Sequence, residues 1–228
     1  MPIREAKQVQ KVYETRGVTT VALRDVDLEI DAGEFTSLAG PSGSGKTTLL
    51  NLFGALDVPT GGQVKLEGDD YAALSPADLA DRRLRKLGFV FQACNLIPVL
   101  SAQENVEFVM ELQGVAPAER RERALDMLEE VGIREYATKR PLEMSGGQQQ
   151  RVAVARAIVS RPRVVLADEP TANLDSGTAT ALLDLMKSLN ERHGVTFVFS
   201  THDPLVIGKA TRRVGLHDGR IVSDERSG

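Results

Sequence analysis

The sequence predicts an α/β fold in which a helical lobe interrupts a β/α core. An apolar run at Phe35–Ala39 is typical of a buried strand, and it leads through a glycine-rich turn into a helix. Strand and helix patterns alternate again from Val164 onward, whereas the stretch between these two parts shows mainly helical spacing. The expected limits are 1–228 for a single domain, 1–92 and 161–228 for its core, and 93–160 for the inserted lobe.

The first third of the chain reads mainly as strands. Residues 9–14 and 20–30 are rich in β-branched and aliphatic side chains. In the second of these ranges apolar and polar residues alternate, apart from one break in phase, which is typical of a strand buried on one face. We expect a further short strand at 63–67 and a buried strand at 87–92.

The turn after the first buried strand carries an eight-residue phosphate-loop motif, Gly-Pro-Ser-Gly-Ser-Gly-Lys-Thr at positions 40–47. It should open a helix at 46–55, so that backbone N–H groups and the helix dipole point at one spot that suits the phosphates of a nucleotide. Gly43 and Gly45 can adopt backbone angles that other residues avoid, which lets the main chain approach the phosphate oxygens. Lys46 supplies positive charge for the β- and γ-phosphates, and the Thr47 hydroxyl is placed to bind Mg²⁺.

We therefore predict a nucleotide site at this loop. The predicted residues are Gly40, Pro41, Ser42, Gly43, Ser44, Gly45, Lys46, Thr47 and Thr48. The alternative is an ordinary flexible Gly/Ser loop, but the strand before the motif and the helix after it favour the nucleotide site.

Helix signals dominate the middle of the chain. Ser75 and a proline in the first turn predict a helix at Pro76–Lys86, and its basic stretch at 82–86 reads as a solvated face rather than a binding patch. Ser101 and Glu104 have the spacing of a capping box. The helices expected in the lobe are 106–112, 117–131 and 147–159.

After the lobe, strands and helices alternate again. We expect a buried strand at 164–167, a helix at 176–192, a strand at 195–200 and a short helix after Pro204. The chain should end in a hairpin, because Asp218-Gly219 is a strong turn signal.

The composition excludes several classes of function. With 42% hydrophobic and 26% charged residues, the 228-residue chain is typical of a globular domain. A single cysteine excludes an internal disulfide and favours a reducing, cytoplasmic setting. The net charge of −4 argues against nucleic acid as a partner. Neither a secretion signal nor a run of about 18 apolar residues occurs, so we expect the chain neither to be secreted nor to cross a membrane.

A second acidic element follows a later buried strand. Asp168 and Glu169 end the run Val-Val-Leu-Ala-Asp-Glu that starts at Val164. Asp168 is suited to hold Mg²⁺ opposite Thr47, and Glu169 can act as a general base on the attacking water. Acidic pairs after strands are common, so this prediction depends on the phosphate loop upstream.

With Met144-Ser145-Gly146-Gly147-Gln148 the chain resembles the ATP-binding cassette (ABC) ATPases, because these residues match the signature sequence of that family. The resemblance covers nearly the whole chain. It implies a P-loop NTPase core with an N-terminal antiparallel β subdomain and an inserted α-helical lobe. It also implies ATP and Mg²⁺ as ligands, with hydrolysis to ADP and phosphate. Met144 replaces the usual leucine of the signature, and Ala172 stands where glycine is frequent, but neither change removes a polar group that the chemistry uses.

The resemblance assigns roles to four more residues. Tyr13 would stack on adenine, Gln92 would sense Mg²⁺ and the γ-phosphate, and His202 would contact the γ-phosphate. Asp175 lies in a loop that would reach the partner subunit. Taken singly, these residues could be a strand aromatic, a polar strand end, a loop histidine and a helix N-cap. Their joint occurrence in the family's order favours the functional roles.

One phosphate loop and one signature imply a dimer. In this family the signature of one subunit closes over ATP held by the other, so Ser145, Gly146, Gly147 and Gln148 would bind the nucleotide of a second copy of the chain. Ser145 and the N–H groups that follow it would form a second anion cradle at a helix start. The expected assembly is an ATP-dependent homodimer.

Three uses of such a motor compete. A soluble ABC ATPase of DNA repair carries a long coiled coil or zinc insertions, yet only 52 residues, 93–144, separate Gln92 from Ser145. A GTPase would need an Asn-Lys-x-Asp motif to recognise the guanine base, and no asparagine here is followed by lysine. The motor subunit of a membrane transporter is therefore favoured.

Within the transporters, the stretches around Phe91, Leu100, Ser145 and Leu166 look most like the lipoprotein-releasing and macrolide-exporter branch. That resemblance implies separate permease chains with four transmembrane helices and a peripheral place on the cytoplasmic face of the inner membrane. Residues 93–95, Ala-Cys-Asn, depart from the version common in that branch. The resemblance implies that these residues border the groove where a permease helix docks. An amino-acid importer subunit is the alternative.

Overall fold

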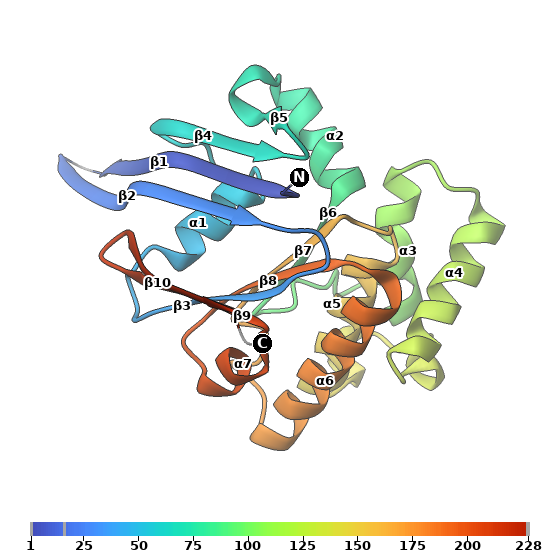
Figure 1. The fold of residues 1–228 in the computed structure, drawn as a ribbon. Coiled ribbons are helices and arrows are strands. Elements are labelled where there is room, and N and C mark those ends of the chain that lie inside the picture. The colour runs from blue at the N-terminus through green and yellow to red at the C-terminus, as the bar shows by residue number, and fades with distance from the viewer. Residues whose placement is uncertain (1, 16, 227–228) are drawn as a thin grey trace.

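The computed structural model describes residues 2–15 and 17–226, and it confirms the predicted α/β fold. The central sheet consists of β3 (Phe35–Ala39), β6 (Leu87–Phe91), β7 (Val164–Asp168), β8 (Thr196–Thr201), β9 (Arg212–His217) and β10 (Arg220–Arg226). Its strand order is β10-β9-β3-β8-β7-β6, and all neighbours are parallel except the β9–β10 hairpin (Figure 1).

The parallel strands are apolar runs because helices cover both faces of the sheet. Every residue of β8 is buried, as are the first four residues of β3 and of β7. The register pairs Ala39 with Thr201, Asp168 with Ser200 and Phe91 with Asp168. The segments that follow β3, β6, β7 and β8 therefore start at one edge of the sheet.

A second, antiparallel sheet lies above the first in the view of Figure 1. It contains β1 (Arg4–Thr15), β2 (Val18–Ile30), β4 (Gly61–Leu66) and β5 (Asp69–Asp70), in the order β2-β1-β4-β5. The strand β1 begins at Arg4, earlier than the predicted residue 9. It is longer because it pairs on both of its edges: Arg4 is opposite both Ile30 and Leu66.

The helices outside the lobe pack against the two sheets or between them. They are α1 (Lys46–Phe53), α2 (Pro76–Lys86), α6 (Ser176–His193) and α7 (Pro204–Lys209), together with the short 3₁₀ turn η1 (Tyr71–Ala73). The helix α1 packs between the two sheets through Leu49, Leu52 and Phe53, which share one hydrophobic core with residues of both. It is shorter than predicted because the chain turns at Gly54 and Ala55, the latter with φ of +51°.

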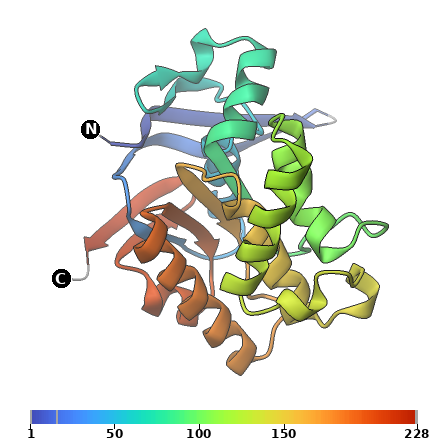
Figure 2. The same cartoon turned by 90° about the vertical axis from the view of Figure 1, so that its right-hand side faces the viewer.

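The segment predicted as the lobe lies to one side of the core (Figures 1 and 2). It contains α3 (Ala102–Leu112), α4 (Pro117–Glu130) and α5 (Gly146–Ile158), with 3₁₀ turns η2 (Arg134–Tyr136) and η3 (Pro141–Glu143). The capping box at Ser101 and Glu104 is present and starts α3 four residues earlier than predicted. A second hydrophobic core, which includes Val106, Val154 and Met186, joins α3, α5 and α6 to the central sheet. Within residues 2–15 and 17–226, no helix is both long and apolar enough to cross a bilayer.

Candidate nucleotide site

The phosphate loop lies between β3 and α1. Gly43 and Gly45 have φ of +80° and +103°, angles at which a residue with a Cβ is strained. The Lys46 ammonium donates hydrogen bonds to the carbonyl oxygens of Gly40, at 2.8 Å, and Pro41, at 2.9 Å. The loop is thus curled around the lysine, and α1 starts at that residue with its N-terminal N–H groups directed toward the turn.

A cavity of about 610 Å³ opens beside this loop. It brings together residues that are distant in sequence and were predicted to share a site. Its lining residues are Tyr13, Thr20, Val21, Ala22, Pro41–Thr48, Gln92, Glu169 and His202. Thr20, Val21 and Ala22 on β2 were not predicted, because alternation on a strand does not reveal which neighbour it faces.

Glu169 sits on the turn after β7 in a left-handed conformation, with φ of +44°. Its carboxylate accepts a hydrogen bond from the Thr201 hydroxyl at 3.1 Å and lies 2.6 Å from Nδ1 of His202. The Glu169 side chain is 17% exposed, whereas that of His202 is 71% exposed. The carboxylate is therefore held in place and largely shielded, as a general base requires, while the imidazole remains accessible to a ligand. Thr201 is the residue that sequence reasoning missed here.

Oxygen ligands suited to a hard cation meet at the start of α1. The Thr47 hydroxyl donates to Asp168 Oδ1 at 3.1 Å, and Ser200 Oγ lies 3.4 Å from the same hydroxyl. Hydroxyl and carboxylate oxygens are the groups that Mg²⁺ prefers in proteins. The predicted third metal residue, Gln92, lines the phosphate-loop cavity, and its backbone carbonyl oxygen accepts a hydrogen bond from the Asn173 side-chain amide at 3.2 Å. The residues present thus fit a magnesium ion bound beside the phosphates.

The signature residues form the start of α5. Ser145 caps the helix: its hydroxyl accepts from the Gln148 N–H at 3.3 Å, and the Gln148 side chain accepts from the Ser145 N–H at 2.8 Å. Gly146 lines a smaller cavity of about 180 Å³, and Gln92 lines both this cavity and the larger one. None of the four signature residues is among those that line the phosphate-loop cavity.

Asp175 is the N-cap of α6, where it accepts hydrogen bonds from the Thr178 N–H at 2.9 Å and the Thr178 hydroxyl at 2.6 Å. These hydrogen bonds hold the pKa of Asp175 below its ordinary value. The structure therefore shows the capping role that sequence analysis kept as an alternative. The predicted contact with a partner subunit stays a prediction.

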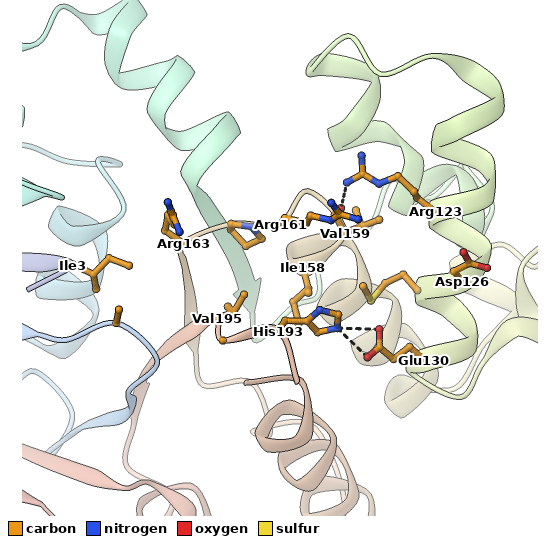
Figure 3. Close-up of a pocket in the computed structure, with 14 residues that line it drawn as sticks. Ile3, Arg123, Asp126, Glu130, Ile158, Val159, Arg161, Arg163, His193 and Val195 are labelled. Carbon is orange, nitrogen blue, oxygen red and sulfur yellow. Dashed lines mark hydrogen bonds and ion pairs between the residues drawn. The ribbon is translucent and has the colours of Figure 1, made fainter. Parts of the chain in front are cut away.

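Another cavity, of about 400 Å³, lies at the opposite edge of the sheet (Figure 3). It is lined by residues that precede β7 and β8, among them Arg163 and Val195, and by residues of α4. His193 at the end of α6 contacts Glu130 of α4 there, at 2.9 and 3.0 Å. Because ligands of parallel α/β sheets bind at the carboxyl ends of the strands, the phosphate-loop cavity is the better candidate for the nucleotide.

Comparisons with known proteins agree with this geometry. The family described as ABC transporter matches residues 23–172. The lipoprotein-releasing system ATP-binding protein LolD of Anaeromyxobacter dehalogenans is 48% identical over 224 residues, which cover 98% of this chain and 94% of that protein. The macrolide export ATP-binding/permease protein MacB of Hyphomonas neptunium is 45% identical over 223 residues, which cover 98% of this chain and 34% of that protein.

A solved structure gives the same result. The ATP-binding cassette MJ0796, in a dimeric post-hydrolysis state bound to ADP and Pi, is similar with a TM-score of 0.91 at 42% identity, and 99% of each chain is covered. The phosphate loop, the acidic strand end and the signature helix thus occur in a fold already known from an ATP-binding cassette. The chain belongs to the ABC transporter family, as an ATP-binding ATPase subunit.

Proposed function

We propose that the chain is the motor subunit of a transporter of the lipoprotein-release and macrolide-export type, and that it works as a homodimer around two ATP molecules. The observation that carries the proposal is the division of the site. Tyr13, the phosphate loop, Glu169 and His202 line one cavity, while the signature at Ser145 lies outside it. A second copy of the chain would supply the missing signature. The dimeric MJ0796 structures support this assembly.

The main polar residues of the site have distinct roles in the proposed reaction. Lys46 and the N–H groups of the phosphate loop hold the β- and γ-phosphates, and Thr47 and Asp168 would hold Mg²⁺, which neutralises phosphate charge. Glu169 orients the attacking water and accepts its proton. His202 contacts the γ-phosphate from its exposed position. Gln92 would contact Mg²⁺ and the γ-phosphate, and it also lines the smaller cavity next to the signature helix of the lobe.

The energetics of closure are sufficient. Changing the ratio of closed to open dimer from about 1:99 to 99:1 requires that ATP bind the closed state more tightly than the open state by roughly 5.5 kcal/mol. A hydrogen bond to a charged group contributes about 1.5–3 kcal/mol. A few contacts from Ser145, Gly146 and Gly147 to the γ-phosphate, made at each site in the closed state alone, would therefore drive the dimer together, and hydrolysis would release it.

An apolar groove supports a separate permease as the partner. The groove, of about 450 Å³, lies between the core and the lobe, and Phe89, Phe91 and Phe108 are among its lining residues. Leu56 and Asn95 also line it, and Leu56 is 50% exposed. A short amphipathic helix from a membrane protein has the chemistry that would fill this groove. We place the chain on the cytoplasmic face of the inner membrane and, given its net charge of −4, assign it no nucleic-acid partner.

Co-purification tests the proposal. The Glu169→Gln variant, which keeps the shape of the side chain but cannot act as a base, would be isolated from membranes in ATP and Mg²⁺. We expect a permease with four transmembrane helices and no solute-binding protein. Recovery of a permease together with a solute-binding protein would instead support the alternative, an amino-acid importer.

A further inference from the structure

Two residues outside the predicted site, Lys11 and Asp57, hold the ring of Tyr13. The Tyr13 hydroxyl donates a hydrogen bond to Asp57 Oδ2 at 2.8 Å. The Lys11 ammonium lies 4.8 Å from the centroid of the Tyr13 ring and donates to Asp57 Oδ1 at 2.6 Å. The ring is thus fixed at its hydroxyl end and covered on one face by a cation. We call Lys11, Tyr13 and Asp57 the tyrosine clamp.

The fold builds the clamp from two elements. Lys11 and Tyr13 are two residues apart on β1, so their side chains share a face of the strand. Asp57 lies four residues beyond the end of α1, the helix that the phosphate loop opens. Lys11 also donates to the carbonyl oxygen of Val58 at 2.9 Å, and Asp57 accepts from the Val58 N–H at 2.7 Å. The clamp therefore fixes the ring of Tyr13 relative to α1 and the phosphate loop before it.

The protonation states of the clamp suit this task. Lys11 is 7% exposed, and a buried ammonium requires a paired anion. Burial acts to raise the pKa of Asp57, but the hydrogen bonds from Lys11 and Tyr13 outweigh it and lower the pKa below its ordinary value. Burial and the bond to Asp57 raise the pKa of Tyr13, which keeps its hydroxyl protonated and able to donate. At neutral pH Asp57 is therefore a carboxylate and Tyr13 a phenol, as the hydrogen bond between them requires.

We propose that Lys11 and Asp57 are positioning residues for adenine: they preset the Tyr13 ring so that the base stacks on the face opposite Lys11. This inference rests on the proposed function and on the role that the family resemblance implies for Tyr13, which lines the phosphate-loop cavity and would stack on adenine. A base can reach only that opposite face, because the ammonium covers the other. A preset ring loses less freedom when the base arrives, so the clamp strengthens binding of the nucleoside rather than of the phosphates.

Calorimetry with ADP and with inorganic pyrophosphate, both in Mg²⁺, separates these two parts of the ligand. Tyr13→Phe keeps the aromatic ring and removes only the bond to Asp57. We expect the Kd for ADP to rise about three- to tenfold and the Kd for pyrophosphate to stay at the parent value. Asp57→Asn, which keeps the shape of the side chain, should act in the same direction. Tyr136→Phe, at a half-buried tyrosine of the lobe, is the matched control and should change neither constant.

The outcomes distinguish the clamp from the stacking itself. Tyr13→Ala should raise the Kd for ADP by about tenfold or more, as expected for loss of the stacking contact with the base. If it does so while Tyr13→Phe and Asp57→Asn bind ADP like the parent, the clamp has no positioning role. If Tyr13→Phe raises the Kd for pyrophosphate as much as the Kd for ADP, the clamp supports the whole site rather than the adenine contact, and the inference is wrong. If even Tyr13→Ala binds ADP normally, the proposed adenine site is itself wrong.

Discussion

A methyl group added at Gly45 would test how closely the phosphate loop packs against the antiparallel sheet. An ideal Cβ at this position lies 2.7 Å from the carbonyl oxygen of Ala22 and 2.9 Å from Cδ2 of Leu23. The first of these atoms is backbone of β2, which is paired with β1 and cannot rotate away as a side chain can. Gly45→Ala must therefore displace the loop or the strand.

Two costs add in this variant. Holding a residue with a Cβ at a φ of +103° costs about 1–2 kcal/mol, and overpacking costs roughly 1–3 kcal/mol more. We expect Gly45→Ala to lower the free energy of unfolding by about 2–5 kcal/mol, a large part of the 5–15 kcal/mol typical of a domain. Urea unfolding at pH 7 measures this change. The variant should also bind ADP more weakly than the parent, because the phosphate loop is displaced.

Gly33→Ala is the matched control. Gly33 has φ of +80° and no atom within 4 Å of its ideal Cβ, so alanine there carries the conformational cost alone. We expect a loss of about 1–2 kcal/mol and normal ADP binding. If Gly45→Ala is no less stable than Gly33→Ala, the close contact between the phosphate loop and β2 does not exist, and the reasoning about this loop is wrong.

Two arginines give further predictions. Arg156 donates 2.7 Å hydrogen bonds to the carbonyl oxygens of Cys94 and Asn95, which follow Gln92. Arg156→Met should lower kcat of ATP hydrolysis by about tenfold through misplacement of Gln92, whereas an unchanged kcat would contradict this. Arg212 hydrogen bonds hold the pKa of Asp224 below its ordinary value, so the stability they add is present at neutral pH and lost as the pH falls through the folded-state pKa. Urea unfolding of the parent and of Arg212→Met measures the difference in their free energies of unfolding, which should become smaller below about pH 4. A difference of constant size down to pH 2 would argue against a stabilising interaction between Arg212 and Asp224.

Local sequence predicted where the nucleotide site lies because its main residues directly follow buried strands. The phosphate loop follows β3, Gln92 follows β6, Glu169 follows β7 and His202 follows β8. Parallel strands in register bring such positions to one edge, so the grouping required no knowledge of side-chain contacts. The motifs also predicted the fold, since the order of strands and helices around them allows few topologies.

Contacts between distant segments could not be predicted in this way. Lys11 and Asp57 are 46 residues apart, and each reads as an ordinary surface charge until β1 and the end of α1 are placed together. Arg4 is similar: its guanidinium is fully buried, 5.0 Å from the centroid of the Tyr71 ring and 5.9 Å from that of Phe53. β1 begins at this arginine rather than at the predicted residue 9, and nothing in the local sequence marks Arg4 as buried.

The central claim is that ATP is enclosed between two copies of this chain, and the mass of the Glu169→Gln variant in solution tests it most directly. Light scattering behind a sizing column, with saturating ATP and Mg²⁺, should give twice the protomer mass of 24.7 kDa. The same variant in ADP should return to the protomer mass, because the γ-phosphate contacts are gone. A protomer mass at saturating ATP would contradict the account.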